Sequence, residues 1–314
     1  MKLTIKALVT AALLWLLFRS VDVGAVWALL AGIALAGVVL ALVLAGLLVL
    51  ADAVLFVGSM RILGRDVPLS VSLLYTLVGW FFSNVAPSTI GGDLFRGVQM
   101  SRLGTPVHVA VRAVVIMRVA TFAALLAVML AGLPVAWSLV REPADLAPFG
   151  ALLLAAGVAV ALLLVFAHLP VPGRMQERWP LLRKATAASG DFRRLLEVDG
   201  LTAKIWSAAA VQHLLRVLIF AVLAAALGLE VPFAALFAFV PAALLTAMVP
   251  VSFGGWGMRE AALVYFLKTT GASAEAALTL SIAFGLLRGA VGAAGGLAWL
   301  LVDKDRFRVD ARSA

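Results

Sequence analysis

Cysteine is absent from this chain of 314 residues, and charged residues make up only 13% of it. The lack of cysteine excludes disulfides, thiolate nucleophiles and metal sites built on sulfur. A soluble domain has about 25% charged residues, so the low share of charge argues against a soluble enzyme. Polar stretches are also short. The longest runs over roughly residues 170–203, which leaves no room for a soluble domain between the apolar segments.

Hydrophobic residues, in contrast, make up 64% of the chain. A helix needs about 20 apolar residues to cross a bilayer. The long apolar runs predict an all-α polytopic membrane protein, a single transmembrane domain over 1–314. About six spanning helices are expected, at roughly 3–18, 24–57, 106–133, 147–168, 204–227 and 275–302. Residues 1–18 resemble a signal peptide, but another apolar run follows without a small-residue cleavage site. We therefore expect this segment to be retained as the first helix.

Basic residues gather in some connections and not in others. Basic clusters lie at 2–6, 61–65, 96–102, 174–204 and 304–312, whereas 134–146 has one arginine against two acids and 228–232 has only an acid. Because cytoplasmic loops of membrane proteins are rich in Lys and Arg, both termini are predicted to be cytoplasmic and 134–146 and 228–232 to be outside. The net charge of +9 is thus attributed to topology in a plasma (inner) membrane and not to nucleic-acid binding.

Two irregular regions, 69–105 and 231–270, interrupt the apolar pattern. The basic clusters at 61–65 and 96–102 are predicted to be cytoplasmic, so segment 69–95 begins and ends inside. Segment 231–270 begins and ends outside. Each must therefore enter the membrane and return, from opposite faces. Two opposed re-entrant broken hairpins predict an inverted repeat, with repeat 1 over about 1–134, repeat 2 over about 146–303 and a basic cytoplasmic tail at 304–314.

The two regions share a ten-residue pattern: Pro87–Arg96 aligns without gaps to Pro250–Arg259, with Ser or Thr, an apolar residue and Gly-Gly in the same places. Irregular backbone inside a bilayer survives only where it lines a cavity or is buried in protein. A short helix after each Gly-Gly would point free N–H groups at an anion, with Arg96 and Arg259 about one turn inside it. Bends that serve packing alone are the alternative.

Three further arginines, Arg118, Arg216 and Arg288, fall near the middle of predicted spans. An arginine at a helix centre costs about 2.5–3.5 kcal/mol on insertion scales, so each should face a wet cavity, a carboxylate or an anion. The intramembrane acids are Asp52, Asp93 and Glu260, fewer than the five arginines, so a net positive cavity is expected. Gln212 and His213 can share the helix face of Arg216.

The predicted substrate-binding residues are Pro87, Ser88, Thr89, Gly91, Gly92, Asp93, Arg96, Arg118, Arg216, Pro250, Ser252, Gly254, Gly255, Trp256, Arg259, Glu260 and Arg288. They predict a lipid translocase that binds an anionic headgroup near the midplane, with no cofactor and no metal. The chain contains no G-x-x-x-x-G-K motif followed by Ser or Thr, so movement is expected to be downhill or ion-coupled. Asp93 and Glu260 are expected either to orient arginines or to carry the coupling proton or cation.

Two alternatives remain at this point. An intramembrane polyprenyl-(di)phosphate phosphatase also uses opposed hairpins, and Ser88 and Ser252 offer hydroxyls beside the arginines, although no positioned base is evident. A non-transporting scaffold for a lipid-modifying enzyme partner is the other.

The stretches NVAPSTIGGDLFRG at 84–97 and PVSFGGWGMRE at 250–260 resemble the lysylphosphatidylglycerol synthase transmembrane family, also called flippase-like membrane proteins. The resemblance extends over nearly the whole chain in length, hydropathy and motif order. It implies the membrane half of the bacterial multiple peptide resistance factor, which moves aminoacylated phosphatidylglycerol between leaflets. Other stand-alone relatives are linked to glycolipid, polyprenyl-phosphate or hopanoid movement. By matching position, Asp93, Arg96, Arg259 and Glu260 would take the family's substrate-site role. Since the chain ends at Ala314 without an aminoacyl-transferase domain, synthase activity is not expected.

Overall fold

The computed structural model describes residues 3–19, 21–85, 91–168, 189–249 and 255–301, and within these ranges the chain is helical with no strand. A short helical segment also covers 189–196. In chain order the labelled helices are α1 (Leu3–Arg19), α2 (Val23–Ala31), α3 (Leu35–Ile62), α4 (Leu69–Val85), α5 (Gly91–Arg102), α6 (Val107–Leu139), η1 (Pro143–Leu146), α7 (Ala147–His168), α10 (Gly200–Ala226), α11 (Phe233–Met248), α12 (Met258–Lys268) and α13 (Ala274–Leu301).

Five segments of the described chain are long and apolar enough to cross a bilayer: α3, α6, Pro143–Val165, α10 and α13. A sixth is possible if α1 and α2 form one broken span, since Thr10–Arg19 and Val23–Ala31 meet at 92°. The prediction of an all-α polytopic membrane protein with about six spans is therefore confirmed. Exposed apolar side chains on α7, such as Leu154 and Leu162, suit contact with lipid.

The expected single span at 24–57 is wrong, because the chain breaks between α2 and α3. The break packs against the end of α10. The amide of Ala34 donates to the carbonyl of Ala226 at 2.8 Å, and Gly37 lies so close to Ala226 that a Cβ there would come within 2.3 Å of the alanine methyl. The Ala226 carbonyl thus accepts a hydrogen bond from the Ala34 amide, which has no partner in its own helix because the chain breaks there.

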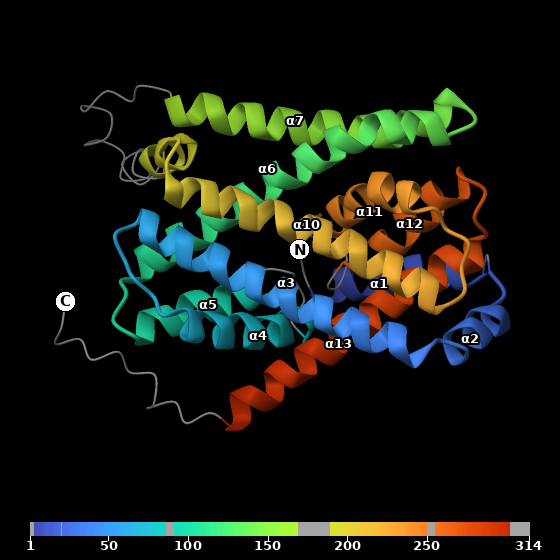
Figure 1. Cartoon of the computed structure of the whole chain (residues 1–314), viewed down its shortest axis with the longest axis horizontal. Coiled ribbons are helices and arrows are strands. Elements are labelled where there is room, and N and C mark those ends of the chain that lie inside the picture. Colours follow the sequence, from blue (N-terminus) through green and yellow to red (C-terminus); the bar gives the residue numbers. More distant parts are fainter. Residues whose placement is uncertain (1–2, 20, 86–90, 169–188, 250–254, 302–314) are drawn as a thin grey trace.

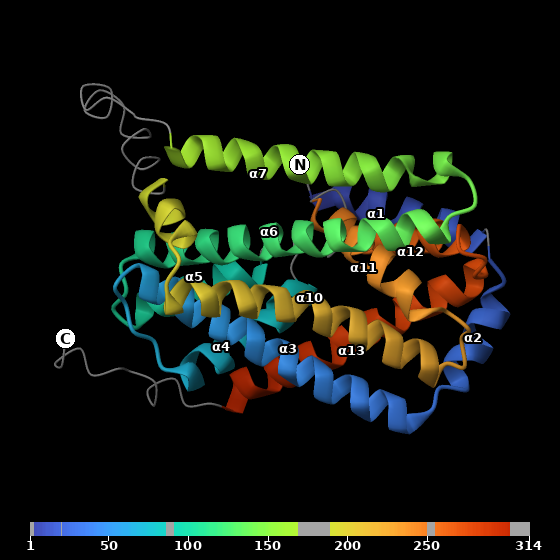
Figure 2. The same cartoon turned by 45° about the horizontal axis from the view of Figure 1, so that its top comes forward.

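Each irregular region consists of two short helices on either side of a break. Helix α4 packs against α5, and α11 packs against α12, so neither region is a straight rod. Figures 1 and 2 show the α4–α5 hairpin in one half of the long axis and the α11–α12 hairpin in the other. The breaks at 86–90 and 250–254 lie outside the described residues. An inverted-repeat relation between residues 1–134 and 146–303 remains a prediction.

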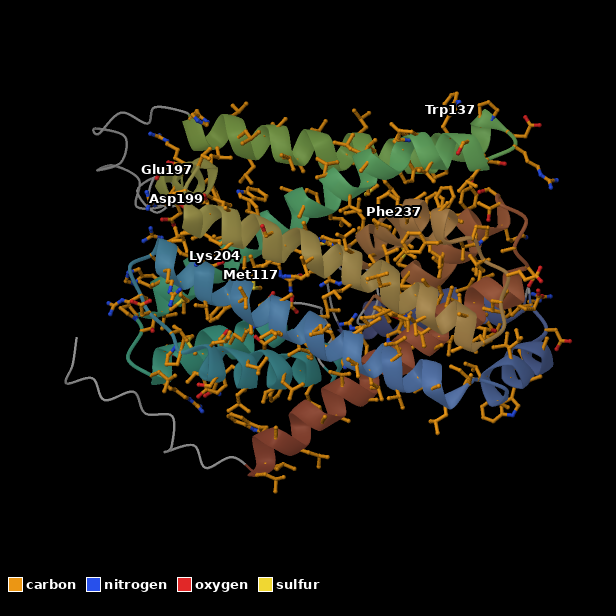
Figure 3. All side chains as sticks on the ribbon, in the orientation of Figure 1. Met117, Trp137, Glu197, Asp199, Lys204 and Phe237 are labelled. Carbon is orange, nitrogen blue, oxygen red and sulfur yellow. The ribbon has the colours of Figure 1, made fainter. Side chains whose placement is uncertain are left out.

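The connections separate into two sets at opposite ends of the bundle. The α3–α4 and α5–α6 turns, the segment before α10 and the end of α13 lie at one end, and the α6–α7, α10–α11 and α12–α13 turns lie at the other (Figure 1). Glu197, Asp199 and Lys204 mark the first end in Figure 3, and Trp137 marks the second. The connections assigned to each side from their charge are thus grouped together in space. Which end faces the cytoplasm remains a prediction, and the 304–314 tail lies outside the described residues.

Candidate functional site

A cavity of about 160 Å³ lies where the two hairpins meet the long helices. Both hairpins and four of the spanning helices contribute side chains, and Met117, one of the lining residues, is labelled between the two ends in Figure 3. Apolar residues form much of the wall. Its polar and charged lining residues are Asp52 on α3, Trp80 and Ser83 on α4, Arg96 on α5, Arg118 and Thr121 on α6, Gln212, His213 and Arg216 on α10, and Arg288 on α13.

The predicted site residues Asp93, Arg96 and Arg118 form one ion-paired group. Asp93 is only 2% exposed, and each of its carboxylate oxygens binds a different arginine. Oδ1 accepts from Nη2 of Arg96 at 2.8 Å, and Oδ2 accepts from Nε of Arg118 at 2.6 Å. One carboxylate is thus shared by two guanidinium groups, so the group keeps a formal charge of +1. Because α5 belongs to the hairpin and α6 to a span, the shared carboxylate also fixes one to the other.

Arg216 is oriented by two neighbours on its own helix. Its Nη2 donates to Oε1 of Gln212 at 3.1 Å, and its Nη1 lies 3.4 Å from Nδ1 of His213. The other ring nitrogen of His213, Nε2, is 2.9 Å from the carbonyl of Thr121 on α6. A carbonyl can only accept and a guanidinium can only donate, so we assign a neutral His213 with its proton on Nε2. His213 therefore positions Arg216 and links α10 to α6.

Arg288 and Asp52 face the cavity without pairing with each other. Among the described residues, no carboxylate lies within salt-bridge distance of the Arg288 guanidinium, and its backbone carbonyl accepts from Nδ2 of Asn84 at 3.0 Å. Asp52 accepts from Nε1 of Trp80 at 3.0 Å. The indole therefore holds the carboxylate of Asp52 on the α3–α4 side of the cavity.

In the second hairpin, Arg259 is neutralised by its neighbours. It is 4% exposed and forms an ion pair with Glu260, while its Nε donates to Oγ of Ser281 at 3.0 Å and its Nη2 to the Ser281 carbonyl at 3.1 Å. Its Cζ lies 5.1 Å from the Trp256 ring centroid and 5.3 Å from that of Phe284, which lines the cavity. Arg259 is thus close to the cavity but is not among its lining side chains.

Two details of the hairpin helices differ from expectation. Helix α12 begins at Met258, so Arg259 is its second residue and does not stand one turn inside. The carboxylate of Glu260 accepts from the amide of Gly257 at 2.7 Å, so the protein's own side chain occupies the helix N-terminus that was expected to face an anion. Helix α5, in contrast, includes the Gly-Gly pair and carries Arg96 in its second turn. The aligned motifs therefore fold differently.

The three glycines of the Gly-Gly pairs that the structure describes have different roles. Gly92 is helical and lies so close to α4 that a Cβ there would be 2.2 Å from the Gly79 carbonyl oxygen. Gly255 has φ +80°, in the left-handed region that favours glycine. Gly91 starts α5. The remaining predicted site residues of the motifs, Pro87, Ser88, Thr89, Pro250, Ser252 and Gly254, lie outside the described residues.

The structure therefore brings Arg96, Arg118, Arg216 and Arg288 to one cavity, with Asp93 paired to two of them. It adds Asp52, Trp80 and Gln212, which the predicted set omitted. Asp52 had a signal in the sequence, because a lone acid in an apolar span marks a functional position. Trp80 had no such signal, since a tryptophan inside an apolar run is usually interpreted as a packing residue.

The family model described as "Lysylphosphatidylglycerol synthase TM region" matches residues 3–296, which include both hairpins and all four cavity arginines. A comparison with curated proteins gave no match. The family match covers far more than half of the chain and agrees with the several apolar helices of the fold. The chain is therefore a multi-pass membrane protein that belongs to the lysylphosphatidylglycerol synthase transmembrane-region family.

Proposed function

We propose that the protein is a lipid translocase, which moves an anionic phospholipid, glycolipid or polyprenyl-phosphate lipid between the leaflets of a plasma (inner) membrane. The observation that carries the proposal is the charge of the cavity. Four arginines line it, and among the residues that the structure describes the carboxylates of Asp52 and Asp93 are the ones that offset them. Charges held away from bulk water are costly unless they are compensated, so a negatively charged ligand is favoured.

The size of the cavity determines which part of a lipid could enter. A protein cavity of about 150 Å³ can hold a molecule of the size of benzene, so a cavity of about 160 Å³ takes a group of similar size. That volume accommodates a phosphate group with some of its substituents but no acyl chain. We therefore propose that the headgroup enters while the acyl chains stay in the bilayer. Rocking of the two halves around the site would then expose the headgroup to each leaflet in turn.

We propose transport and not hydrolysis because neither Thr121 nor His213, which both line the cavity, is placed to act as a nucleophile or as its base. The hydroxyl of Thr121 donates to the Met117 carbonyl at 2.9 Å. Both ring nitrogens of His213 have partners, Thr121 and Arg216, so the histidine is not placed to take a proton from a hydroxyl. An assay for released phosphate, run beside the transport assay, separates the two functions.

The test is movement of fluorescent anionic lipids in proteoliposomes, with two matched variants of α6. Arg118→Gln removes a cavity arginine. Arg112→Gln removes an arginine whose ion pair with Asp191 ties α6 to the 189–196 segment and which does not line the cavity. We expect Arg118→Gln to slow movement at least about tenfold, the effect of losing one charged hydrogen bond, and Arg112→Gln to retain the wild-type rate. Equal rates in Arg118→Gln and the wild type, with both proteins folded, would refute the proposal.

A further inference from the structure

The cavity presents hydrogen-bond donors that have no acceptor. Gln212 is only 1% exposed, and its Nε2 has no hydrogen-bond partner within the described parts of the chain. The orientation of its amide is fixed, because the guanidinium of Arg216 can only donate and so must face Oε1. A buried amide N–H without a partner costs about 1–3 kcal/mol, and such groups need an explanation. Since Gln212 lines the cavity beside Arg216, a ligand rich in acceptors would supply the missing partner.

The charges around the cavity leave a surplus of two. Arg96, Arg118, Arg216 and Arg288 contribute four positive charges, and Asp52 and Asp93 contribute two negative ones. Arg259 and Glu260 cancel each other. The hairpin tips at 86–90 and 250–254 contain no charged residue, so they cannot change this balance. A ligand that neutralises the site therefore carries two negative charges.

The phosphate groups of lipids fall into two classes that differ in charge. A phosphodiester has two unesterified oxygens and one negative charge at every pH of interest. A phosphomonoester has three such oxygens and about two negative charges above its second pKa of about 6. Three acceptor oxygens also match the three donor side chains that α10 and α13 present together, Gln212, Arg216 and Arg288. Arginine's planar fork suits such oxygens well.

We propose that the site selects a phosphate group with two negative charges, such as a phosphomonoester headgroup, over a phosphodiester. Gln212, Arg216 and Arg288 form the cradle for its three oxygens, and the Asp93-linked pair Arg96 and Arg118 completes the positive field. The inference rests on the proposed translocase function and specifies its substrate class.

The test compares phosphatidic acid, a phosphomonoester, with phosphatidylglycerol, a phosphodiester, by native mass spectrometry of the full chain and by transport in proteoliposomes. Both are measured at pH 8 and pH 5. We expect phosphatidic acid to bind at least about tenfold more tightly at pH 8, as one further charged hydrogen bond would give, and to lose this advantage at pH 5, where it carries one charge.

Titratable protein groups also face the cavity, and the direction of the change in the ratio separates their effect from that of the ligand. Asp52 on α3, Asp93 on α5 and His213 on α10 are the titratable groups that face or pair with the cavity arginines. A change in any of them alters the binding of both lipids. Only the ionisation of the ligand itself alters the ratio of the two affinities in the expected direction.

Two variants test the charge count and the unused donor in turn. Arg288→Gln lowers the surplus to one, so we expect the preference for phosphatidic acid at pH 8 to fall at least about tenfold. Gln212→Met removes the unused donor and should weaken phosphatidic acid more than phosphatidylglycerol. Arg112→Gln, outside the cavity, should leave the ratio unchanged, and intact elution of each variant from size exclusion confirms folding.

The outcomes distinguish a failure of the dianion inference from a failure of the translocase proposal. If both lipids bind and move equally at pH 8, the dianion inference is wrong while the translocase proposal stands. If neither lipid moves but inorganic phosphate, unlike chloride, raises the unfolding temperature in detergent, the dianion chemistry holds for a free phosphate and the translocase proposal fails. If neither the lipids nor inorganic phosphate bind, both proposals fail.

Discussion

Replacing Gly92 by alanine tests the close packing of the first hairpin. A Cβ at Gly92 would lie 2.2 Å from the backbone oxygen of Gly79 and 2.4 Å from Oγ of Ser83, both on α4. A carbon and an oxygen that are not bonded approach to about 3.3–3.6 Å, so the methyl group requires a shift of roughly 1 Å. A backbone oxygen cannot rotate away, and the two arms of the hairpin must therefore separate.

The expected cost follows from three contributions. Overpacking of this kind costs about 1–3 kcal/mol. Separation of the arms also weakens the hydrogen bond from the Gly92 amide to Oγ of Ser83, 3.2 Å long, which contributes about 0.5–1.5 kcal/mol. Alanine in place of a helical glycine gains about 0.5–1 kcal/mol. Gly92→Ala should therefore destabilise the protein by about 1–3 kcal/mol, because the gain and the lost hydrogen bond nearly cancel.

Gly97 provides the matched control on the same helix. No atom lies within 4 Å of the position that its Cβ would take, so Gly97→Ala keeps only the gain in helix propensity. We expect Gly97→Ala to unfold at a higher temperature than the wild type and Gly92→Ala at a lower one, with a difference of roughly 5 °C or more. Thermal unfolding of the purified protein in detergent, followed by size-exclusion fluorescence, measures both. If Gly92→Ala is as stable as Gly97→Ala, the arms of the hairpin are not in contact at this position.

Three further changes probe the surroundings of the cavity. Asp93→Asn leaves the buried guanidinium of Arg96 and the partly exposed one of Arg118 without their shared carboxylate, and the loss at Arg96 should cost about 3–5 kcal/mol, seen as a large fall in unfolding temperature. Trp80→Phe frees the Asp52 carboxylate to approach the arginines, so inorganic phosphate should raise the unfolding temperature less than in the wild type. The amide of Thr202, which donates to Asp199, lowers the pKa of that carboxyl. The Asp199 carboxylate caps α10, and its stabilising contribution should be fully present above the unfolded pKa of about 3.9. This contribution should be lost as the pH falls through the lower pKa of the folded state. Asp199→Asn, which keeps a cap without the charge, should abolish that pH dependence of unfolding.

Hydropathy and charge predicted the helical class, the two broken regions and the mid-span arginines, because each depends on the cost of placing a chain segment in lipid. The break between α2 and α3 was missed for the same reason. Residues 31–35 are as apolar as the helices beside them, and the break packs against Ala226, nearly 200 positions away. A pattern of local hydropathy contains no information about that contact.

The pairing of charges could likewise not be predicted from the sequence. Counting arginines and acids predicted a positive surplus but could not say that Arg259 would be satisfied locally while Arg288 would not. The Gly-Gly motifs align residue for residue, and yet Glu260 caps α12 whereas Asp93 binds two arginines. Glu260 aligns with Gly97 and Asp93 aligns with Trp256, so the carboxylate of each hairpin comes from a different position. The distribution of charge therefore follows from aligned positions at which the two motifs carry different residues.

The contacts between the two predicted repeats suggest how a ligand could drive movement. Around the cavity, among the described residues, two hydrogen bonds join residues of one repeat to the other: His213 to the Thr121 carbonyl, and Asn84 to the Arg288 carbonyl. These two bonds contribute about 1 kcal/mol each to a boundary at which α3 also packs against α10 and α4 against α13. A bound anion, however, would lie between Arg96 and Arg118 of one repeat and Arg216 and Arg288 of the other, and would add ion pairs across the same boundary. Because a ligand shifts a conformational equilibrium only by its difference in affinity for the two states, the anion should favour the state in which all four arginines converge.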